Sequence, residues 1–225
     1  MRLADGEVRR LVLLRHGRTP WNLIDRAQGH TDVQLDDCGH AQARAAASCL
    51  AGQHPVRLWT SDLARARQTA AYLEEATGLV AQPDRRLREF DVGVRSGLTR
   101  TEFAERHPAE YAAWVAGEPG PLVPGEESVE QVRARVTPAL TDCLAALGPG
   151  ETGIAVLHGT CVKVGLFAVL GWPPVPTRSL RVLANGAWAV LVQGPDDPLP
   201  RLAAYNLAPR RQTEGADFAS SEGVG

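Results

Sequence analysis

Two histidines in this chain of 225 residues each follow directly on an apolar run, and this placement could support several kinds of chemistry. Residues 11–14 are all aliphatic and are followed by Arg15 and His16, and His158 likewise follows the apolar residues 153–157. A histidine beside a fixed cation can act as a general base, a metal ligand or a nucleophile. Position alone therefore leaves the role of these two histidines open.

Both apolar runs have the length and composition of buried strands. Four consecutive aliphatic residues suit a strand that is covered on both faces, as in a mostly parallel sheet. Ligands of such sheets bind at the carboxyl ends of the strands, where both histidines fall. If the two strands are parallel neighbours, His16 and His158 lie side by side at one edge of the sheet.

Capping residues, glycines and prolines delimit the other elements. We predict a three-layer α/β/α sandwich with a mostly parallel sheet, in one domain of residues 1–225, with a cap over about residues 90–125 and a disordered tail over about residues 210–225. The predicted helices are residues 37–50 after the Asp36 cap, 62–76, 99–116 with a break at Pro108, 128–147 and 160–170. Further strands are predicted at residues 56–60, 79–81 and 202–205, and a β-hairpin at residues 179–192 with a type I′ turn at Asn185 and Gly186.

The composition is that of a globular protein with no strong overall charge. Hydrophobic residues make up 44% of the chain, and 24 basic residues oppose 26 acidic ones, a net charge of −2. This balance gives no field that would attract nucleic acid or an anionic membrane. Residues 1–10 contain no apolar signal core, and no stretch approaches the roughly 18 apolar residues of a membrane span, so we expect a cytoplasmic protein. The four scattered cysteines form neither a zinc motif nor a disulfide framework.

The residues around the first histidine resemble a known signature. Residues 15–22 read RHGRTPWN, which resembles the histidine phosphatase superfamily, the phosphoglycerate mutase-like enzymes, with its pattern of RHG, a variable residue, T, a variable residue and WN. Further stretches match in the family's order, and together they cover about residues 10–207: Gln28 and Gly29, residues 61–66 with 69–70, residues 87–89 with Gly93 and Gly97, residues 125–128, and residues 157–159. The resemblance implies the phosphoglycerate mutase-like fold.

The resemblance also implies a role for each site residue. His16 would be the nucleophile, and Glu89 would protonate the leaving alcohol and later activate water. Arg15, Arg65 and His158 would bind the phosphoryl oxygens, for which arginine forks and a histidine are suitable donors. No metal and no cofactor is implied. The residues expected to contact the substrate are Asn22, Gln28, Gly29, Arg88, Gly159 and Thr160.

Each assignment has a structural alternative. The histidines could be satisfied core residues, and the arginines could be partners in surface ion pairs. Glu89 lies in an arginine-rich loop, where an acid is often only a salt-bridge partner. Two positions depart from the family pattern: Arg18 stands where glutamate or glutamine is common, and Thr160 where a second glycine often follows His-Gly. Several arginines in the loops favour an anionic substrate with a group beyond the phosphate, namely Arg26, Arg88, Arg95 and Arg100.

These observations favour a phosphatase that hydrolyses a small phosphomonoester, such as a sugar phosphate or a phosphoglycerate-type ester, through a phosphohistidine. The first alternative is a cofactor-dependent phosphoglycerate mutase, but mutases of that family carry a Tyr and a Lys after the acid and an arginine pair, and this chain lacks that set. The second is a non-catalytic module that binds phosphate esters. The expected partner is the small-molecule substrate, with no nucleic acid and no membrane, and the oligomeric state stays open, a homodimer included.

Overall fold

The computed structural model describes residues 7–116, 123–173 and 180–209. It contains one six-stranded sheet in the order β3-β2-β4-β1-β5-β6. The pairs β1–β4, β2–β4 and β2–β3 are parallel, whereas β5 runs antiparallel to both of its neighbours. The strands are β1 Arg9–Arg15, β2 Arg57–Thr60, β3 Gln82–Pro83, β4 Thr152–Leu157, β5 Trp188–Gln193 and β6 Arg201–Leu207. The predicted mostly parallel α/β fold is confirmed.

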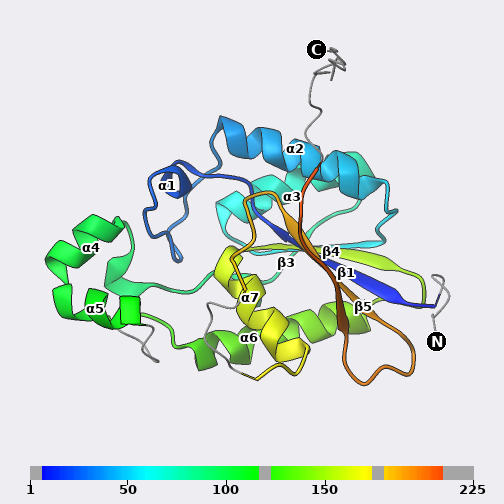
Figure 1. Cartoon of the computed structure of the whole chain (residues 1–225). Coiled ribbons are helices and arrows are strands. Elements are labelled where there is room, and N and C mark those ends of the chain that lie inside the picture. Colours follow the sequence, from blue (N-terminus) through cyan, green and yellow to red (C-terminus); the bar gives the residue numbers. More distant parts are fainter. Residues whose placement is uncertain (1–6, 117–122, 174–179, 210–225) are drawn as a thin grey trace, which may run out of the picture.

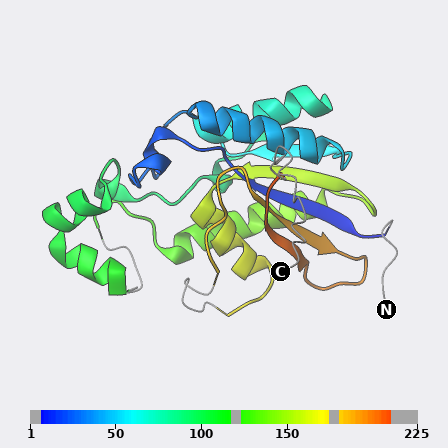
Figure 2. The ribbon, with the colours of Figure 1, turned by 45° about the horizontal axis from the view of Figure 1, so that its top comes forward.

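Helices cover both faces of this sheet (Figures 1 and 2), with α2 and α3 on one face and α6 and α7 on the other. The sequence of β1 shows why, because its side chains alternate between two cores. Leu11 and Leu13 belong to the cluster that includes residues of α6 and α7, whereas Val12 and Leu14 belong to the cluster of α2 and α3. The helices are α1 Pro20–Leu23, α2 Asp37–Ala51, α3 Ala64–Thr77, α4 Arg100–Arg106, α5 Pro108–Ala116, α6 Val129–Ala145 and α7 Gly159–Val169.

Local hydrogen bonds fix the predicted helix ends. The Asp36 side chain accepts a hydrogen bond from the Gly39 N–H and caps α2. Thr99 and Ser128 form capping boxes at the starts of α4 and α6, as their sequences predicted. Gly78 ends α3 with a φ of 73°, a left-handed conformation that glycine adopts without steric cost. These elements are therefore set by residues close in sequence.

Helices α4 and α5 lie to one side of the sheet (Figures 1 and 2), in the region predicted as a cap. Tyr111 and Trp114 pack edge-on against Phe103, with ring centroids 5.8 and 6.4 Å away. The two rings thus form part of a local aromatic core. Residues 117–122 of this region, and the tail predicted at residues 210–225, lie outside the described residues. No helix in the described ranges is both long and apolar enough to cross a lipid bilayer.

Two strand predictions are wrong, and one helix begins later than predicted. The strand predicted at residues 79–81 is instead the two-residue edge strand β3, and the Ala81 N–H donates to the Glu74 side chain. The second strand of the predicted hairpin is present as β5, but residues 180–183 form no strand, and β5 pairs with β1 on one side and β6 on the other; residue 179 lies outside the description. The turn is not type I′, since Gly186 has a positive φ and Asn185 does not. Helix α3 starts at Ala64.

Candidate active site

The two histidines lie side by side, as the parallel arrangement of their strands predicted. Arg15, the last residue of β1, is in register with Leu157, the last residue of β4, and a histidine follows each of them. The His16 N–H donates to the Leu157 carbonyl at 3.0 Å. The His16 and His158 ring centroids are 5.1 Å apart. The sheet itself therefore fixes the distance between the two rings.

The His16 ring is buried, and one of its two nitrogens contacts the main chain of the next residue. Its Nδ1 lies 2.7 Å from the Gly17 carbonyl oxygen. A carbonyl can only accept, so Nδ1 carries the proton and Nε2 carries the lone pair. Burial lowers the pKa of His16 well below its usual range, and the charges of Arg65 and Arg15 lower it further. The imidazole is therefore neutral at pH 7, which a nitrogen nucleophile requires.

His158 is fully buried, and both of its ring nitrogens have partners. The Arg65 Nε donates to its Nδ1 at 3.2 Å, so its Nε2 carries the proton and donates to the Ser61 hydroxyl at 2.9 Å. Burial lowers the pKa of His158 well below its usual range, and Arg65 and His16 contribute in the same direction. Ser61 follows the carboxyl end of β2, the strand beside β4, so a third strand supports the same site.

Arg65 is 1% exposed and lies in the first turn of α3. Its two terminal nitrogens donate to the carbonyls of Thr31 and Gly29, at 2.9 and 2.8 Å. Burial lowers the Arg65 pKa to about 10, which leaves the guanidinium charged at neutral pH. Gly29 has a φ of +50°, and a Cβ there would lie 2.7 Å from a Val92 methyl group. Gly29 therefore supports Arg65 through its main chain.

Arg15 contributes a second buried cation with an unused donor. Its Nη1 donates to the Leu183 carbonyl, whereas its Nε is buried and has no hydrogen-bond partner among the described residues. Burial lowers the Arg15 pKa, and the negative charge of Glu89 raises it. A Cβ on Gly159 would lie 3.2 Å from the Arg15 Nε, so α7 approaches the guanidinium closely. A buried donor without an acceptor is costly, and a bound anion would satisfy it.

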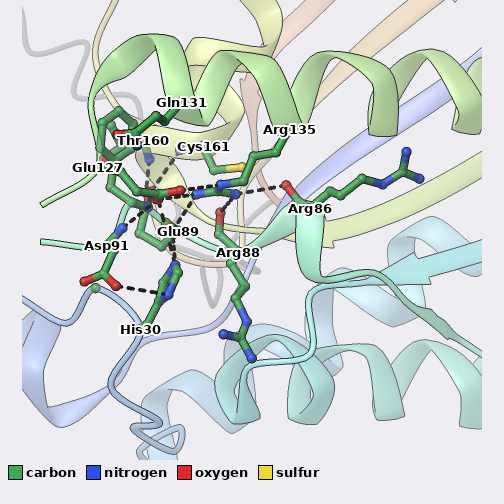
Figure 3. A network of polar contacts seen from close by, with 12 residues as sticks. His30, Arg86, Arg88, Glu89, Asp91, Glu127, Gln131, Arg135, Thr160 and Cys161 are labelled. Atoms are coloured by element: carbon green, nitrogen blue, oxygen red, sulfur yellow. Dashed lines mark hydrogen bonds and ion pairs between the residues drawn. The ribbon is translucent and has the colours of Figure 1, made fainter. Parts of the chain in front are cut away.

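Glu89 lies at the amino end of α7. Its Oε1 accepts from the N–H groups of Phe90 and Cys161, at 3.0 and 2.9 Å. Its Oε2 accepts from the Thr160 N–H at 3.0 Å. The negative charge of Glu89 raises the pKa of both Arg15 and Arg65, so the carboxylate lies near these two buried cations. Figure 3 shows Glu89 between α7 and α6, close to His30 and Arg135.

The other residues predicted to contact the substrate differ in whether their side chains already bind other parts of the chain. The buried side-chain oxygen of Gln28 has no partner in the described part of the chain, whereas the Asn22 oxygen already accepts from the Thr19 N–H at 3.0 Å. Arg88 forms a bidentate ion pair with Asp62, at 2.7 and 2.6 Å, and its guanidinium points away from Glu89 (Figure 3). The Asp62 hydrogen bonds raise the Arg88 pKa. Arg88 is therefore engaged with the chain itself.

The extra positive charge expected in the loops is neutralised. Each of the four loop arginines that were expected to favour an anionic substrate lies within ion-pair distance of a carboxylate. The same is true of Arg18, which binds Asp36, the cap of α2, at 2.8 Å. The pairs are Arg26–Glu102, Arg88–Asp62, Arg95–Glu126 and Arg100–Asp25. Because these arginines are paired with carboxylates, their positive charge is no longer evidence that the substrate carries an anionic group beyond the phosphate.

Several contacts of the site were not predicted from sequence. The Asn185 amide donates to the His16 carbonyl at 3.1 Å, whereas the Asn-Gly sequence predicts only a hairpin turn there. The buried Thr69 hydroxyl accepts from the Gly17 N–H at 3.0 Å and donates to the Arg65 carbonyl at 2.7 Å. The signal for Thr69 was its place in the family-like block after Arg65. No sequence pattern indicated that Arg135 of α6 contacts the Glu89 carbonyl, because an arginine on an amphipathic helix is usually a surface residue.

The described part of the chain contains no cluster of three or more His, Cys, Asp or Glu side chains suited to a metal ion. Cys38, Cys49, Cys143 and Cys161 are all free thiols. Cys143 and Cys161 are buried, and burial raises the pKa of both, to about 12 for Cys143. A raised pKa leaves little thiolate at neutral pH, so neither is suited to nucleophilic attack.

Comparisons with known proteins agree with this geometry. Residues 11–207 match the histidine phosphatase superfamily (branch 1). The chain is 37% identical over 191 residues to a glucosyl-3-phosphoglycerate phosphatase of Mycobacterium tuberculosis, covering 81% of this chain and 85% of the relative. It is 35% identical over 176 residues to a probable phosphoglycerate mutase GpmB of Yersinia enterocolitica, covering 76% and 80%. A mycobacterial glucosyl-3-phosphoglycerate phosphatase solved with VO3 superimposes with a TM-score of 0.78 at 35% identity, over 89% of this chain and 100% of that one.

Proposed function

This chain belongs to the histidine phosphatase superfamily, and from that premise we propose that it hydrolyses a small phosphomonoester through a phosphohistidine on His16. The observation that carries this proposal is the His16 ring. It is buried between two arginines, its Nδ1–H is bound by the Gly17 carbonyl, and its Nε2 is left with a lone pair. A neutral, oriented imidazole beside fixed cations suits attack on a phosphorus atom.

In the first step His16 Nε2 forms a bond to phosphorus and the bond between phosphorus and the ester oxygen breaks. The leaving oxygen takes a proton from the Glu89 carboxyl group and departs as an alcohol. Arg15 and Arg65 bind the phosphoryl oxygens, where charge accumulates. His158 joins them if its Nε2–H turns from the Ser61 hydroxyl to a phosphoryl oxygen.

In the second step water attacks the phosphohistidine. The Glu89 carboxylate accepts a proton from the water as the new phosphorus–oxygen bond forms, and the phosphorus–nitrogen bond breaks. Inorganic phosphate leaves, and His16 returns to its neutral form with Glu89 protonated. The same two residues thus serve both steps, and no cofactor enters the scheme.

For the substrate we propose a sugar-phosphate or phosphoglycerate-type ester. The support is the identity to glucosyl-3-phosphoglycerate phosphatases, which is accompanied by structural similarity over nearly the whole described chain. Phosphoglycerate mutase activity is less favoured, because mutases of the family bind phosphoglycerate with a Tyr and a Lys after the acid and an arginine pair, and the chain lacks that set. A phosphate-release screen over sugar phosphates, phosphoglycerates and nucleotides identifies the substrate class, and preference for nucleotides would contradict this assignment.

The test of the mechanism is His16→Ala. The variant should fold with native circular dichroism and lose turnover by several orders of magnitude, since the phosphoryl acceptor is gone. In the wild-type protein, rapid alkaline quenching should trap phosphate that is stable to alkali, labile to acid and attached to His16. Turnover by His16→Ala near the wild-type rate would overturn the proposal.

A further inference from the structure

We infer that Arg135, a residue of α6 outside the reacting groups, positions Glu89 for protonation of the leaving group. The inference rests on the proposed function, because it assigns Arg135 a role only through the acid. Arg135 donates hydrogen bonds to three main-chain carbonyls of residues 86–89, the segment that ends at Glu89 (Figure 3). Its Nη1 contacts the carbonyls of Arg86 and Arg88 at 2.9 and 2.7 Å, and its Nη2 contacts the Glu89 carbonyl at 2.8 Å.

Glu127 orients the Arg135 guanidinium. The pair is bidentate, with Nε to Oε1 at 2.8 Å and Nη2 to Oε2 at 2.7 Å. Burial raises the pKa of Glu127, but the hydrogen bonds from Arg135 and from the Asp91 N–H lower it by more. The Arg135 side chain is only 19% exposed, so this pair is shielded from screening by solvent. Glu127 lies just before Ser128, the cap of α6, and the helix start therefore anchors the pair.

His30 adds a contact from the loop after β1. Its Nε2 donates to the same Glu89 carbonyl at 2.8 Å. Because Gly29, the preceding residue, accepts from Arg65, this loop connects the acid with the phosphate-binding cation. The Glu89 main chain is thus bound by α6 and by the first loop, while its side chain is bound by the amino end of α7.

This arrangement requires an arginine. A guanidinium carries five N–H donors in a rigid plane, whereas a lysine ammonium carries three on a flexible stem. Lysine can therefore keep the ion pair with Glu127 but cannot also bind the three carbonyls in fixed directions. A general acid must lie within hydrogen-bond reach of the leaving oxygen, and a displacement of about 1 Å can reduce the rate on the order of 100-fold.

The experiment compares Arg135→Lys with Arg133→Lys, a matched control at an exposed position on the same helix. Values of kcat/KM are measured on a sugar phosphate, whose alkoxide needs a proton, and on p-nitrophenyl phosphate, whose leaving group does not. We expect Arg135→Lys to lower kcat/KM on the sugar phosphate by about tenfold more than on the aryl ester. Arg133→Lys should leave both unchanged, and equal losses on the two esters with Arg135→Lys would overturn the inference.

A double-mutant cycle with Glu89→Gln separates positioning from a general structural effect. If Arg135 acts through Glu89, Arg135→Lys should cause no further loss on the sugar phosphate once Glu89 is Gln. Additive losses would overturn the inference while leaving the acid role intact. Equal activity of Glu89→Gln and wild type on both esters would remove the proposed acid and the inference together. If Arg135→Lys fails to fold, Glu127→Gln replaces it, with the same selective loss expected and a uniform loss contradicting it.

Discussion

At the scale of single residues, burial sets the charge states of the groups that we propose bind and attack the phosphate ester. His16 and Arg65 are at most 3% exposed. The Arg15 Nε and the Gln28 side-chain oxygen are buried and have no partner within residues 7–116, 123–173 and 180–209. Burial lowers the pKa of the two arginines and leaves both charged, because their usual value is so high. The same burial keeps the histidines neutral. Burial alone thus accounts for two charged arginines next to two neutral histidines, the combination that the proposed mechanism requires.

A single methyl group next to Arg15 should disturb this site. A Cβ at Gly159 would lie 2.4 Å from a Val182 methyl group and 3.2 Å from the Arg15 Nε. Val182 is exposed and can move, so the cost to stability should be small, whereas Arg15 must shift within the site. We expect Gly159→Ala to lower kcat/KM by about tenfold or more, as expected for a displaced binding group.

The matched test is the double variant Gly159→Ala with Val182→Ala, which removes the first contact and keeps the second. Steady-state kinetics on both proteins, together with their thermal unfolding midpoints, separates the two contacts. Recovery of wild-type kcat/KM in the double variant would show that Val182, and not Arg15, carried the effect.

At the scale of elements, the loop after β1 crosses the start of α2 at main-chain contact distance. A Cβ on Gly17 would lie 2.3 Å from the Gly39 carbonyl oxygen, and a Cβ on Gly39 would lie 2.0 Å from the Arg18 carbonyl oxygen. The crossing places His16 directly before a loop that α2 and the Thr69 hydroxyl of α3 both bind. Two glycines therefore allow the loop after His16 to pack onto the helix layer.

This crossing reverses the usual effect of glycine in a helix. Replacing a helical glycine by alanine normally stabilises a protein by about 1 kcal/mol. Gly39→Ala should instead destabilise by about 1–3 kcal/mol, because the contact is with rigid main chain. Gly52→Ala at the other end of α2, where the nearest atom would be 3.6 Å away, is the control. Urea unfolding of both variants measures the difference, and a gain in stability with Gly39→Ala would contradict the crossing.

At the scale of the whole molecule, the two buried histidines couple stability to pH. The pKa of each is below its unfolded value near 6.5, so the folded state stays neutral while the unfolded state takes up protons. The contribution of the two neutral histidines to the free energy of unfolding is therefore fully present above about pH 6.5 and is lost as the pH falls below that value. The slope is at most about 1.4 kcal/mol per pH unit for each histidine.

Replacing His16 by Asn should remove one of these two contributions. The free energy of unfolding of the wild-type protein should fall between pH 7 and pH 5 more steeply than that of His16→Asn. Urea unfolding at several pH values in that window measures both slopes. Equal slopes for the two proteins would show that His16 takes up its proton equally in the folded and unfolded states.

The sequence by itself determined the parts of this protein that depend on neighbouring residues. Apolar runs predicted β1 and β4, capping residues predicted the starts of α2, α4 and α6, and Gly78 predicted the end of α3. The position of His16 and His158 at the ends of parallel strands also followed, because carboxyl ends of parallel strands meet at one edge of a sheet. The order of the family-like motifs indicated the superfamily, which the comparisons confirmed.

Only the tertiary structure decided which partners each side chain has. Local pattern predicted that residues 179–183 pair with β5 in a hairpin, but β1 and β6 occupy the two hydrogen-bonding edges of β5. The Asn185 amide binds the His16 carbonyl. Arg88 and Arg135 are both arginines near Glu89 in space, yet one binds Asp62 and the other binds the Glu89 main chain. Residue type sets what an arginine can donate, but the packing of α3 and α6 against the loop sets the acceptor it meets.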